Sequence, residues 1–404
     1  MNVGDVAFMM VATALVMLMT PGLALFYGGL VRAKNVLSII MQCFIALGLI
    51  SLIWFVYGYS LAFGPDKGKL IGDFSYLFLR GVGFEPGPAD TIPHLLFCAF
   101  QLMFAIITPA LITGAFAERM KFSAYLLFTA LWLTFVYLPL CHWVWGGGWI
   151  GELGALDFAG GTVIHIASGA SALAAALVLG PRVGWRREPI HPHNLPLTVL
   201  GAGLLWFGWF GFNAGSALAA DNIAVLALMN THLAAGLAAL SWAFAEWIFQ
   251  GKPTTLGAVS GAIAGLVAIT PAAGFVPVWS SIIIGLAAGI ICYLAVILKP
   301  RIGYDDALDV VGVHGVGGLF GALITGVFAS TAVNPGGANG LLFGNAKQLL
   351  IQGAGAFAAV VYCFVLSYIL LKVVNALVGL RVEREAEIQG LDLSEHGESG
   401  YYLS

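Results

Sequence analysis

The charged residues of this chain occur in short groups, and long charge-free runs separate the groups. Ten of these runs exceed the roughly 20 residues that a helix needs to cross the hydrocarbon core of a bilayer. The runs extend over 6–31, 35–65, 91–117, 122–151, 158–181, 189–220, 222–245, 253–298, 310–346 and 348–371. This pattern predicts an all-α, polytopic membrane protein.

The composition agrees with this class. Charged residues make up 9% of the chain and hydrophobic residues 60%, whereas about 25% of the residues of a soluble domain are charged. The net charge is −3 without a basic block, so nucleic acid is not an expected partner. The five cysteines are odd in number and form no Cys-x-x-Cys pair, which argues against a disulfide scaffold.

The run 253–298 is long enough for two crossings. As one helix its 46 residues would extend about 69 Å, roughly twice a bilayer core of about 30 Å. The segment 274–277 is the expected turn, so we predict eleven transmembrane helices.

An odd number of transmembrane helices places the two termini on opposite sides of the membrane. Alternate loops and the tail hold 13 of the 17 basic residues, which predicts an external N-terminus and a cytoplasmic C-terminus.

Two short identities suggest an internal repeat. Ile107-Thr108-Pro109-Ala110 recurs as Ile269-Thr270-Pro271-Ala272, and Ala155-Leu156-Asp157 recurs as Ala307-Leu308-Asp309. Chance could produce such matches in a chain rich in alanine and glycine, but each aspartate is also followed by a histidine in the same run. We therefore predict one domain over 1–404, with inverted five-helix repeats at 6–181 and 189–346. An eleventh helix at 347–378 and a tail at 379–404 follow.

Two histidines are expected near the centre of the membrane. His165 lies eight residues after Asp157, about 12 Å along a helix, and His314 lies in the second half of the chain. Ionisable groups at this depth are functional candidates. A metal site is disfavoured because no third ligand falls at matching depth, and no cofactor is predicted. Asp157 is interpreted as a helix-capping acid.

Three further polar residues receive structural interpretations. Glu246 lies close to the end of its run and is expected to reach the membrane interface. His142 and His232 are isolated, and we interpret them as hydrogen-bonded core or interface residues. Aromatic residues crowd other runs: Phe100 and Phe104 share one helix face, and Trp206 to Phe212 precede Ser216. Aromatic rings beside a hydroxyl and neutral imidazoles suit a small cation that donates hydrogen bonds.

Over nearly its whole length the chain resembles the ammonium transporter (Amt) branch of the Amt/Mep/Rh family, of the bacterial or archaeal type. The matching segments are Phe26-Tyr27-Gly28-Gly29-Leu30-Val31-Arg32, the stretch from Asp157 to His165, Gly208 to Ser216, Gly312-Val313-His314-Gly315-Val316, Gly390-Leu391-Asp392 and His396-Gly397-Glu398. The resemblance implies an ammonium transporter of the cell inner (plasma) membrane. It also implies a homotrimer and a regulatory tail that meets a PII-type protein.

The resemblance also implies roles for individual residues. Trp145, Phe104 and Ser216 would form an external recruitment site, and Phe104 with Phe212 a gate of two rings. His165 and His314 would be the twin histidines of the pore. Asp157 would shape the vestibule, and Gln101 and Trp209 would line the path.

These expectations lead to a transport hypothesis. Ammonium would be recruited outside, deprotonated, and conducted as ammonia past the histidines; the sequence leaves open whether the proton is co-transported. One alternative is an ammonium sensor that signals through a PII-type partner. A membrane-embedded enzyme is disfavoured because no nucleophile or third metal ligand accompanies the histidines.

Overall fold

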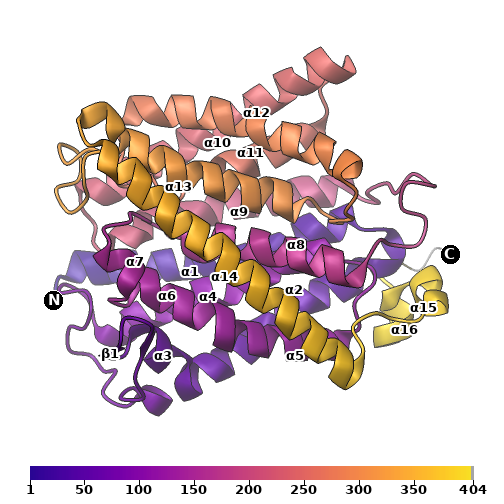
Figure 1. Cartoon of the computed structure of the whole chain (residues 1–404), viewed down its shortest axis with the longest axis horizontal. Coiled ribbons are helices and arrows are strands. Elements are labelled where there is room, and N and C mark those ends of the chain that lie inside the picture. Colours follow the sequence, from indigo (N-terminus) through magenta and orange to yellow (C-terminus); the bar gives the residue numbers. More distant parts are fainter. Residues whose placement is uncertain (402–404) are drawn as a thin grey trace.

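The computed structural model describes residues 1–401 and forms a bundle of long helices that run in nearly the same direction (Figure 1). The last three residues of the predicted tail, 402–404, lie outside the described residues. Six crossing segments are single helices: α1 (Val3–Leu30), α4 (His94–Phe116), α10 (Asn222–Gln250), α11 (Thr255–Ile269), α12 (Val278–Ile302) and α14 (Ala346–Val378). The N-terminus and the C-terminal tail lie at opposite ends of the bundle, which we call the N-terminal face and the tail face.

The other five crossing segments are composite, with π-helical or 3₁₀ turns in their paths. They are η1 (Ala33–Asn35), α2 (Val36–Ile53), η2 (Trp54–Gly58) and α3 (Tyr59–Phe63); α5 (Phe122–Trp132), η4 (Leu133–Tyr137), α6 (Leu138–Trp145) and α7 (Trp149–Glu152); η5 (Gly161–Ile166) and α8 (Ala167–Leu179); α9 (Leu195–Ala214) and η6 (Gly215–Ala217); and η7 (Val311–Val316) and α13 (Gly317–Phe328). Short elements complete the described chain: β1 (Asp66–Lys67), β2 (Ile71–Gly72), η3 (Leu77–Leu79), η8 (Leu341–Phe343), α15 (Arg384–Gln389) and α16 (Leu391–His396).

The prediction of an all-α protein with eleven apolar helical segments is confirmed. Ten segments are long and apolar enough to cross a membrane, and α11 is a shorter apolar helix. The expected turn also occurs, because α11 ends at Ile269 and α12 begins at Val278. The connection contains Pro271 and Pro277, and Pro277 is the N-cap residue of α12.

Small residues allow the helices to pack closely. At Gly201 of α9, an added Cβ would lie 2.2 Å from the backbone nitrogen of Phe26 in α1. No side chain fits in that space, so the glycine lets the two backbones approach each other. Such contacts replace the hydrophobic driving force that lipid does not provide between transmembrane helices.

A buried ion-pair network lies at the tail face. Arg182, in the loop after α8, donates from its backbone nitrogen, Nε and Nη2 to the carboxylate of Asp305 at 2.8–2.9 Å. Its Nη1 lies 3.4 Å from Glu118 Oε2, and Glu118 also pairs with Arg32 at 2.7 Å. The network therefore links the loops that follow α1, α4, α8 and α12.

We expect Asp305→Asn to lower the free energy of unfolding by about 2 kcal/mol at neutral pH, because Arg182 loses a charged partner. Burial by itself would raise the pKa of Asp305, but the hydrogen bonds and charge of Arg182 outweigh it and lower the pKa below 3.8. The ionised carboxylate therefore stabilises the fold above pH 3.8, and this contribution is lost as the pH falls through the lowered pKa.

Unfolding of the detergent-solubilised protein at several pH values would measure this effect. The difference between wild type and Asp305→Asn should shrink in acid, while Asp90→Asn, at an exposed site, should change little at any pH. A difference that is independent of pH would contradict the assignment.

The tail folds back onto the tail face (Figure 1). Asp392 in α16 accepts hydrogen bonds from the backbone nitrogens of Leu37 and Ser38, at 3.0 and 2.8 Å. Glu387 in α15 accepts from the backbone nitrogen of Val183 at 2.6 Å. The tail is thus bound to the start of α2 and to the loop after α8, and not only attached at the end of α14.

Candidate functional site

Three cavities follow one another between the N-terminal face and the tail face. The outer cavity has a volume of about 200 Å³ and is lined by Phe104, Trp145 and Ser216 among others. The central cavity, of about 10 Å³, is lined by Phe212, His165 and His314. The tail-side cavity, of about 140 Å³, shares His314 with the central one. The central cavity is no larger than about one water molecule, so it is the narrowest part of the path.

The outer cavity combines aromatic rings with hydrogen-bond acceptors. The Trp145 indole is held by its Nε1, which donates to the backbone oxygen of Asp157 at 2.9 Å, and its ring meets that of Phe104 edge-on at 6.0 Å. Ser216 Oγ donates to Phe212 O at 2.9 Å, which leaves its lone pairs free to accept. Gln101 Oε1 is buried without a hydrogen-bond partner in the described chain. A cation with N–H groups would find ring faces and oxygen acceptors here.

Two phenylalanine rings separate the outer cavity from the central one. Phe104 of α4 and Phe212 of α9 have ring centroids 4.4 Å apart and planes inclined by 33°. Both side chains are almost completely buried, at 1% exposure each. The two rings therefore lie in contact between the outer and central cavities, which Phe104 and Phe212 line respectively.

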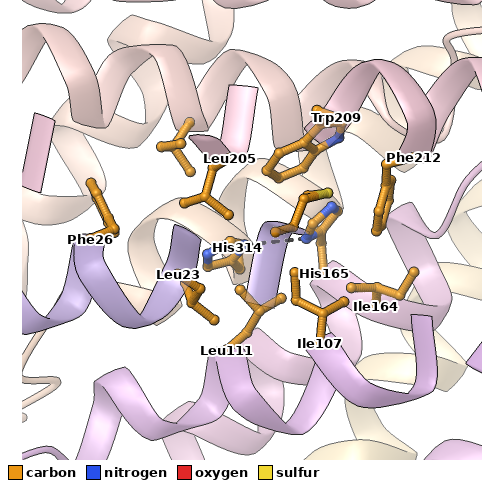
Figure 2. A pocket seen from close by; sticks show the side chains of 12 residues that line it. Leu23, Phe26, Ile107, Leu111, Ile164, His165, Leu205, Trp209, Phe212 and His314 are labelled. Atoms are coloured by element: carbon orange, nitrogen blue, oxygen red, sulfur yellow. Dashed lines mark hydrogen bonds between the residues drawn. The ribbon is translucent and has the colours of Figure 1, made fainter. Parts of the chain in front are cut away.

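The two predicted pore histidines are in direct contact. His165 lies in η5 and His314 in η7, and their Nδ1 atoms are 3.2 Å apart (Figure 2). The rings are nearly parallel, with an interplanar angle of 20° and centroids 5.3 Å apart. Trp209 stacks on the other side of His165 at 5.4 Å. The sequence placed both histidines at similar depth, and the structure brings them together.

This contact constrains the protonation of the neutral pair. One Nδ1 must carry hydrogen and the other must accept it, so the two rings have opposite tautomers. One Nε2 is then a donor and the other an acceptor. His165 Nε2 is buried without a partner in the described residues, which leaves this atom free to bond a small polar solute.

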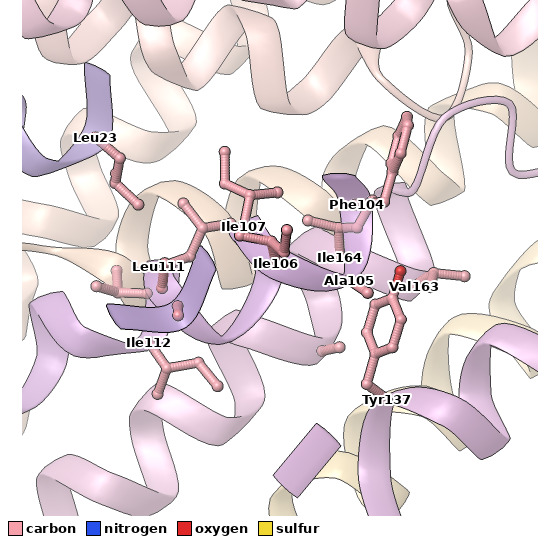
Figure 3. Close-up of a cluster of buried hydrophobic side chains, with 14 of the residues drawn as sticks. Leu23, Phe104, Ala105, Ile106, Ile107, Leu111, Ile112, Tyr137, Val163 and Ile164 are labelled. Carbon is pink, nitrogen blue, oxygen red and sulfur yellow. The ribbon is translucent and has the colours of Figure 1, made fainter. Parts of the chain in front are cut away.

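The walls around the histidines are apolar. Figure 3 shows Ile107 and Leu111 of α4 beside Ile164 of η5, and Leu23 of α1 nearby. These side chains offer no hydrogen bonds, so the imidazoles are the main polar groups of the central cavity. An unpaired charge is costly in such surroundings.

Aspartates begin both histidine-bearing segments. Asp157 accepts hydrogen bonds from the backbone nitrogens of Gly160, Gly161, Thr162 and Val163, at 2.6–3.1 Å. These are the donors that a helix start leaves without an internal partner. The carboxylate therefore fixes the start of η5, and with it the position of His165.

The counterpart of Asp157 in the second half is Asp306, not Asp309 as the repeated Ala-Leu-Asp sequence indicated. Asp306 accepts from the backbone nitrogen of Val311 at 2.7 Å and precedes His314 by eight residues, the same separation as between Asp157 and His165. Asp309 instead pairs with Lys299 at 2.5 Å. The aspartate of the repeated Ala-Leu-Asp sequence thus lies three residues after the aspartate that caps the segment.

The tail-side cavity contains residues that the sequence analysis did not assign to the path. Tyr27, Ser260, Glu246 and Asp309 contribute to its lining. Glu246 is buried at 7% exposure, and its Oε2 accepts from Thr254 N at 2.8 Å. Glu246 is therefore held inside the protein at the start of α11, where it lines the tail-side cavity.

The isolated histidines differ in their surroundings. His142 is completely buried, with Nδ1 3.0 Å from Ala62 O and Nε2 2.9 Å from Asp66 Oδ1. His232 is exposed and contacts the rings of Trp206 and Phe210. Neither contributes to the three cavities of the path.

Some lining residues of the outer cavity were missed by sequence reasoning, namely Phe63, Pro88, Phe97, Phe158 and Leu218. They come from segments that are distant in the sequence, and no local pattern links them. Within residues 1–401, no three His, Cys, Asp or Glu side chains gather in a way that could hold a metal ion.

Comparisons with known proteins agree with a transport path. The model of the Ammonium Transporter Family matches residues 7–401. An ammonium transporter of Bacillus subtilis is 53% identical over 99% of both chains. The crystal structure of Candida albicans Mep2 superposes with a TM-score of 0.92 at 39% identity, covering 99% of this chain and 90% of that one. A sensor Amt protein gives a TM-score of 0.90 at 32% identity, covering 97% and 98%. The family match and the 53% identity show that the chain belongs to the ammonium transporter family, which is a family of transporters and not of enzymes.

Proposed function

We propose that the protein binds ammonium at the outer cavity, removes a proton, and conducts ammonia past the histidine pair. The observation that carries this proposal is the order of sites along one path: an aromatic cavity with free acceptors, a closed pair of rings, and two hydrogen-bonded imidazoles in an apolar channel. The N-terminal face would be external and the tail face cytoplasmic, in the cell inner membrane.

The chemistry of the path favours ammonium over potassium, which has a similar size. Trp145 and Phe104 attract any cation through their ring faces, but only ammonium can donate hydrogen bonds to Ser216 and Gln101. Beyond the rings a bare ion loses its water without replacement, whereas neutral ammonia needs few hydrogen bonds. His165 and His314 would supply these bonds and carry the proton, since an imidazole accepts at one nitrogen and donates at the other.

Uptake of ammonium by proteoliposomes that contain the purified protein tests the function directly. We expect uptake of ammonium well above that of protein-free liposomes. We expect no uptake of potassium above that level. Uptake equal to that of protein-free liposomes would contradict transport. Currents recorded in the same membranes would show whether the proton accompanies ammonia.

Replacing Trp145 with leucine is expected to raise the half-saturating ammonium concentration about five-fold, because a cation–π contact contributes on the order of 1 kcal/mol. Initial uptake rates over a range of ammonium concentrations would measure this. The matched control is Trp279→Leu, which removes an exposed indole at the start of α12. An equal shift in both variants would point to a general effect of indole loss.

Gly318→Ala is expected to lower ammonium uptake about ten-fold through displacement of a histidine. A Cβ at Gly318 would lie 2.8 Å from the Cβ of His165 and 3.0 Å from the nitrogen of Ile166, so α13 or η5 must move. Small misplacements of reacting groups have large effects on rate. Gly203→Ala is the control, because an added Cβ there meets nothing within 4 Å. Normal uptake by Gly318→Ala would show that the histidine position tolerates the shift.

A sensor role is the second candidate, and two observations favour it. One similar structure is a sensor Amt protein, and the tail of this chain is hydrogen-bonded to the start of α2 and to the loop after α8. We propose that a homotrimer presents these tails to a PII-type partner. Retention of a PII protein by the full chain, but not by a chain ending at Gly379, would support the interaction; equal retention would place the contact elsewhere.

A further inference from the structure

An arginine-lined cavity opens on the tail face, apart from the transport path. It has a volume of about 290 Å³ and lies between the loop after α8 and the start of the tail after α14. Four arginines contribute to its lining, namely Arg182, Arg187, Arg381 and Arg384, and no acidic residue does. The cavity therefore has a positive wall.

Two of the arginines are held in place by acids that lie outside the lining. Arg182 binds Asp305 through Nε and Nη2 and approaches Glu118 through Nη1. Arg381 binds Glu387 through Nε and Nη2 and donates from Nη1 to Leu179 O at 3.0 Å. Each guanidinium has five N–H groups, so each keeps donors that these bonds do not use. The ion pairs therefore fix the two guanidinium groups but leave some of their N–H donors unused.

The other two arginines are exposed and have no such compensation. Arg187 precedes Glu188, and Arg384 begins α15. Neither guanidinium forms a salt bridge with a carboxylate in residues 1–401. Like charges brought together in one cavity oppose folding unless an anion accompanies them. The arrangement is thus typical of a site for an anionic group.

We propose that this cavity binds a phosphate group, with Arg187 and Arg384 as its main charged contacts. A guanidinium presents planar paired donors that match phosphate oxygens. A phosphate monoester carries nearly two negative charges at neutral pH, which balances these two arginines. The unused donors of Arg182 and Arg381 would complete the coordination.

The position of the cavity allows two sources for the phosphate. It lies where α8 and α14 end, so a lipid head group could reach it, as basic pockets between transmembrane helices allow. A soluble phosphate could also bind from the aqueous side. In either case the anion would bridge the loop 181–187 to the tail, beside the existing bond from Val183 N to Glu387.

Binding to the purified full chain tests the site in two arms. The soluble arm measures inorganic phosphate by equilibrium dialysis in detergent. The lipid arm measures retention of phosphatidic acid by the protein in nanodiscs that otherwise contain phosphatidylcholine. The test variant is the double substitution Arg187→Gln and Arg384→Gln. The control is Arg301→Gln, which removes an exposed arginine at the end of α12, outside the cavity.

We expect saturable binding in at least one arm, an affinity at least about ten-fold lower in the double variant, and no change in the control. Loss in the soluble arm alone identifies free phosphate, loss in the lipid arm alone identifies a head group, and loss in both identifies a site that accepts either. The proposal is overturned if neither ligand binds, or if Arg301→Gln reduces binding as much as the double variant. The readout is independent of ammonium transport, so it remains valid whatever the uptake assay shows.

Discussion

His165→Ala is expected to remove most of the preference for ammonium over potassium, reducing the ratio of the two transport rates about 100-fold. Alanine provides neither the Nε2 that faces the central cavity nor the Nδ1 that contacts His314. The substitution also widens the central cavity. A cation could then keep hydration water that it would have to lose in the wild type. Two orders of magnitude correspond to about 2.7 kcal/mol of differential stabilisation, within the range of charged or relayed hydrogen bonds.

Currents across a planar membrane given ammonium and then potassium would measure the ratio. His232→Ala is the matched control, because this imidazole is exposed on α10 and lies outside the path. The relay hypothesis predicts an unchanged ratio for the control. Full retention of the preference in His165→Ala would show that selection is complete before the histidines, at the outer cavity or the ring pair.

Asp157→Ala is expected to destabilise the fold by at least about 4 kcal/mol. The carboxylate accepts four backbone hydrogen bonds at the start of η5, and each buried donor left without a partner costs about 1–3 kcal/mol. Water has little access to replace the carboxylate, since Asp157 is only 8% exposed. Denaturant unfolding of the purified protein, together with the amount recovered from membranes, would measure the loss.

Asp157→Asn separates the loss of charge from the loss of shape. The amide keeps one acceptor oxygen in nearly the same place, so we expect a loss of stability that lies between those of wild type and Asp157→Ala. If Asp157→Ala cost less than about 1 kcal/mol, the start of η5 would have to be held by the packing of its glycines, and the capping interpretation would be wrong.

The crossing helices could be predicted because lipid imposes a length and a polarity that charge-free runs reveal directly. The turn at 274–277 follows from the same constraint, since one helix cannot contain 46 apolar residues within a bilayer. The meeting of His165 and His314 was also expected, because each follows an aspartate within an apolar run. All of these depend on local sequence and on the rise of a helix.

Other features depend on contacts that local sequence does not encode. The π-helical turns η5 and η7 have glycine and β-branched residues that also occur in ordinary helices here, so no pattern distinguished them. The place of Glu246 in the lining of the tail-side cavity depends on its contact with Thr254, which the sequence does not encode. The capping role of Asp306 could have been predicted from the distance between each aspartate and the following histidine, instead of from the identical Ala-Leu-Asp sequences. The separation between aspartate and histidine is eight residues in both halves, while the Ala-Leu-Asp sequence recurs three residues later relative to the capping acid.

The contact between the two Nδ1 atoms gives the histidine pair a direction. Before a proton passes, one ring end is the donor and the other the acceptor; after a proton moves through the pair, both rings have exchanged tautomers and the direction is reversed. A second proton cannot follow the same way until the pair is restored, by a return transfer or by rotation of the rings. If the proposed proton relay operates, the pore would therefore conduct in cycles with a resetting step, and its turnover would slow in heavy water.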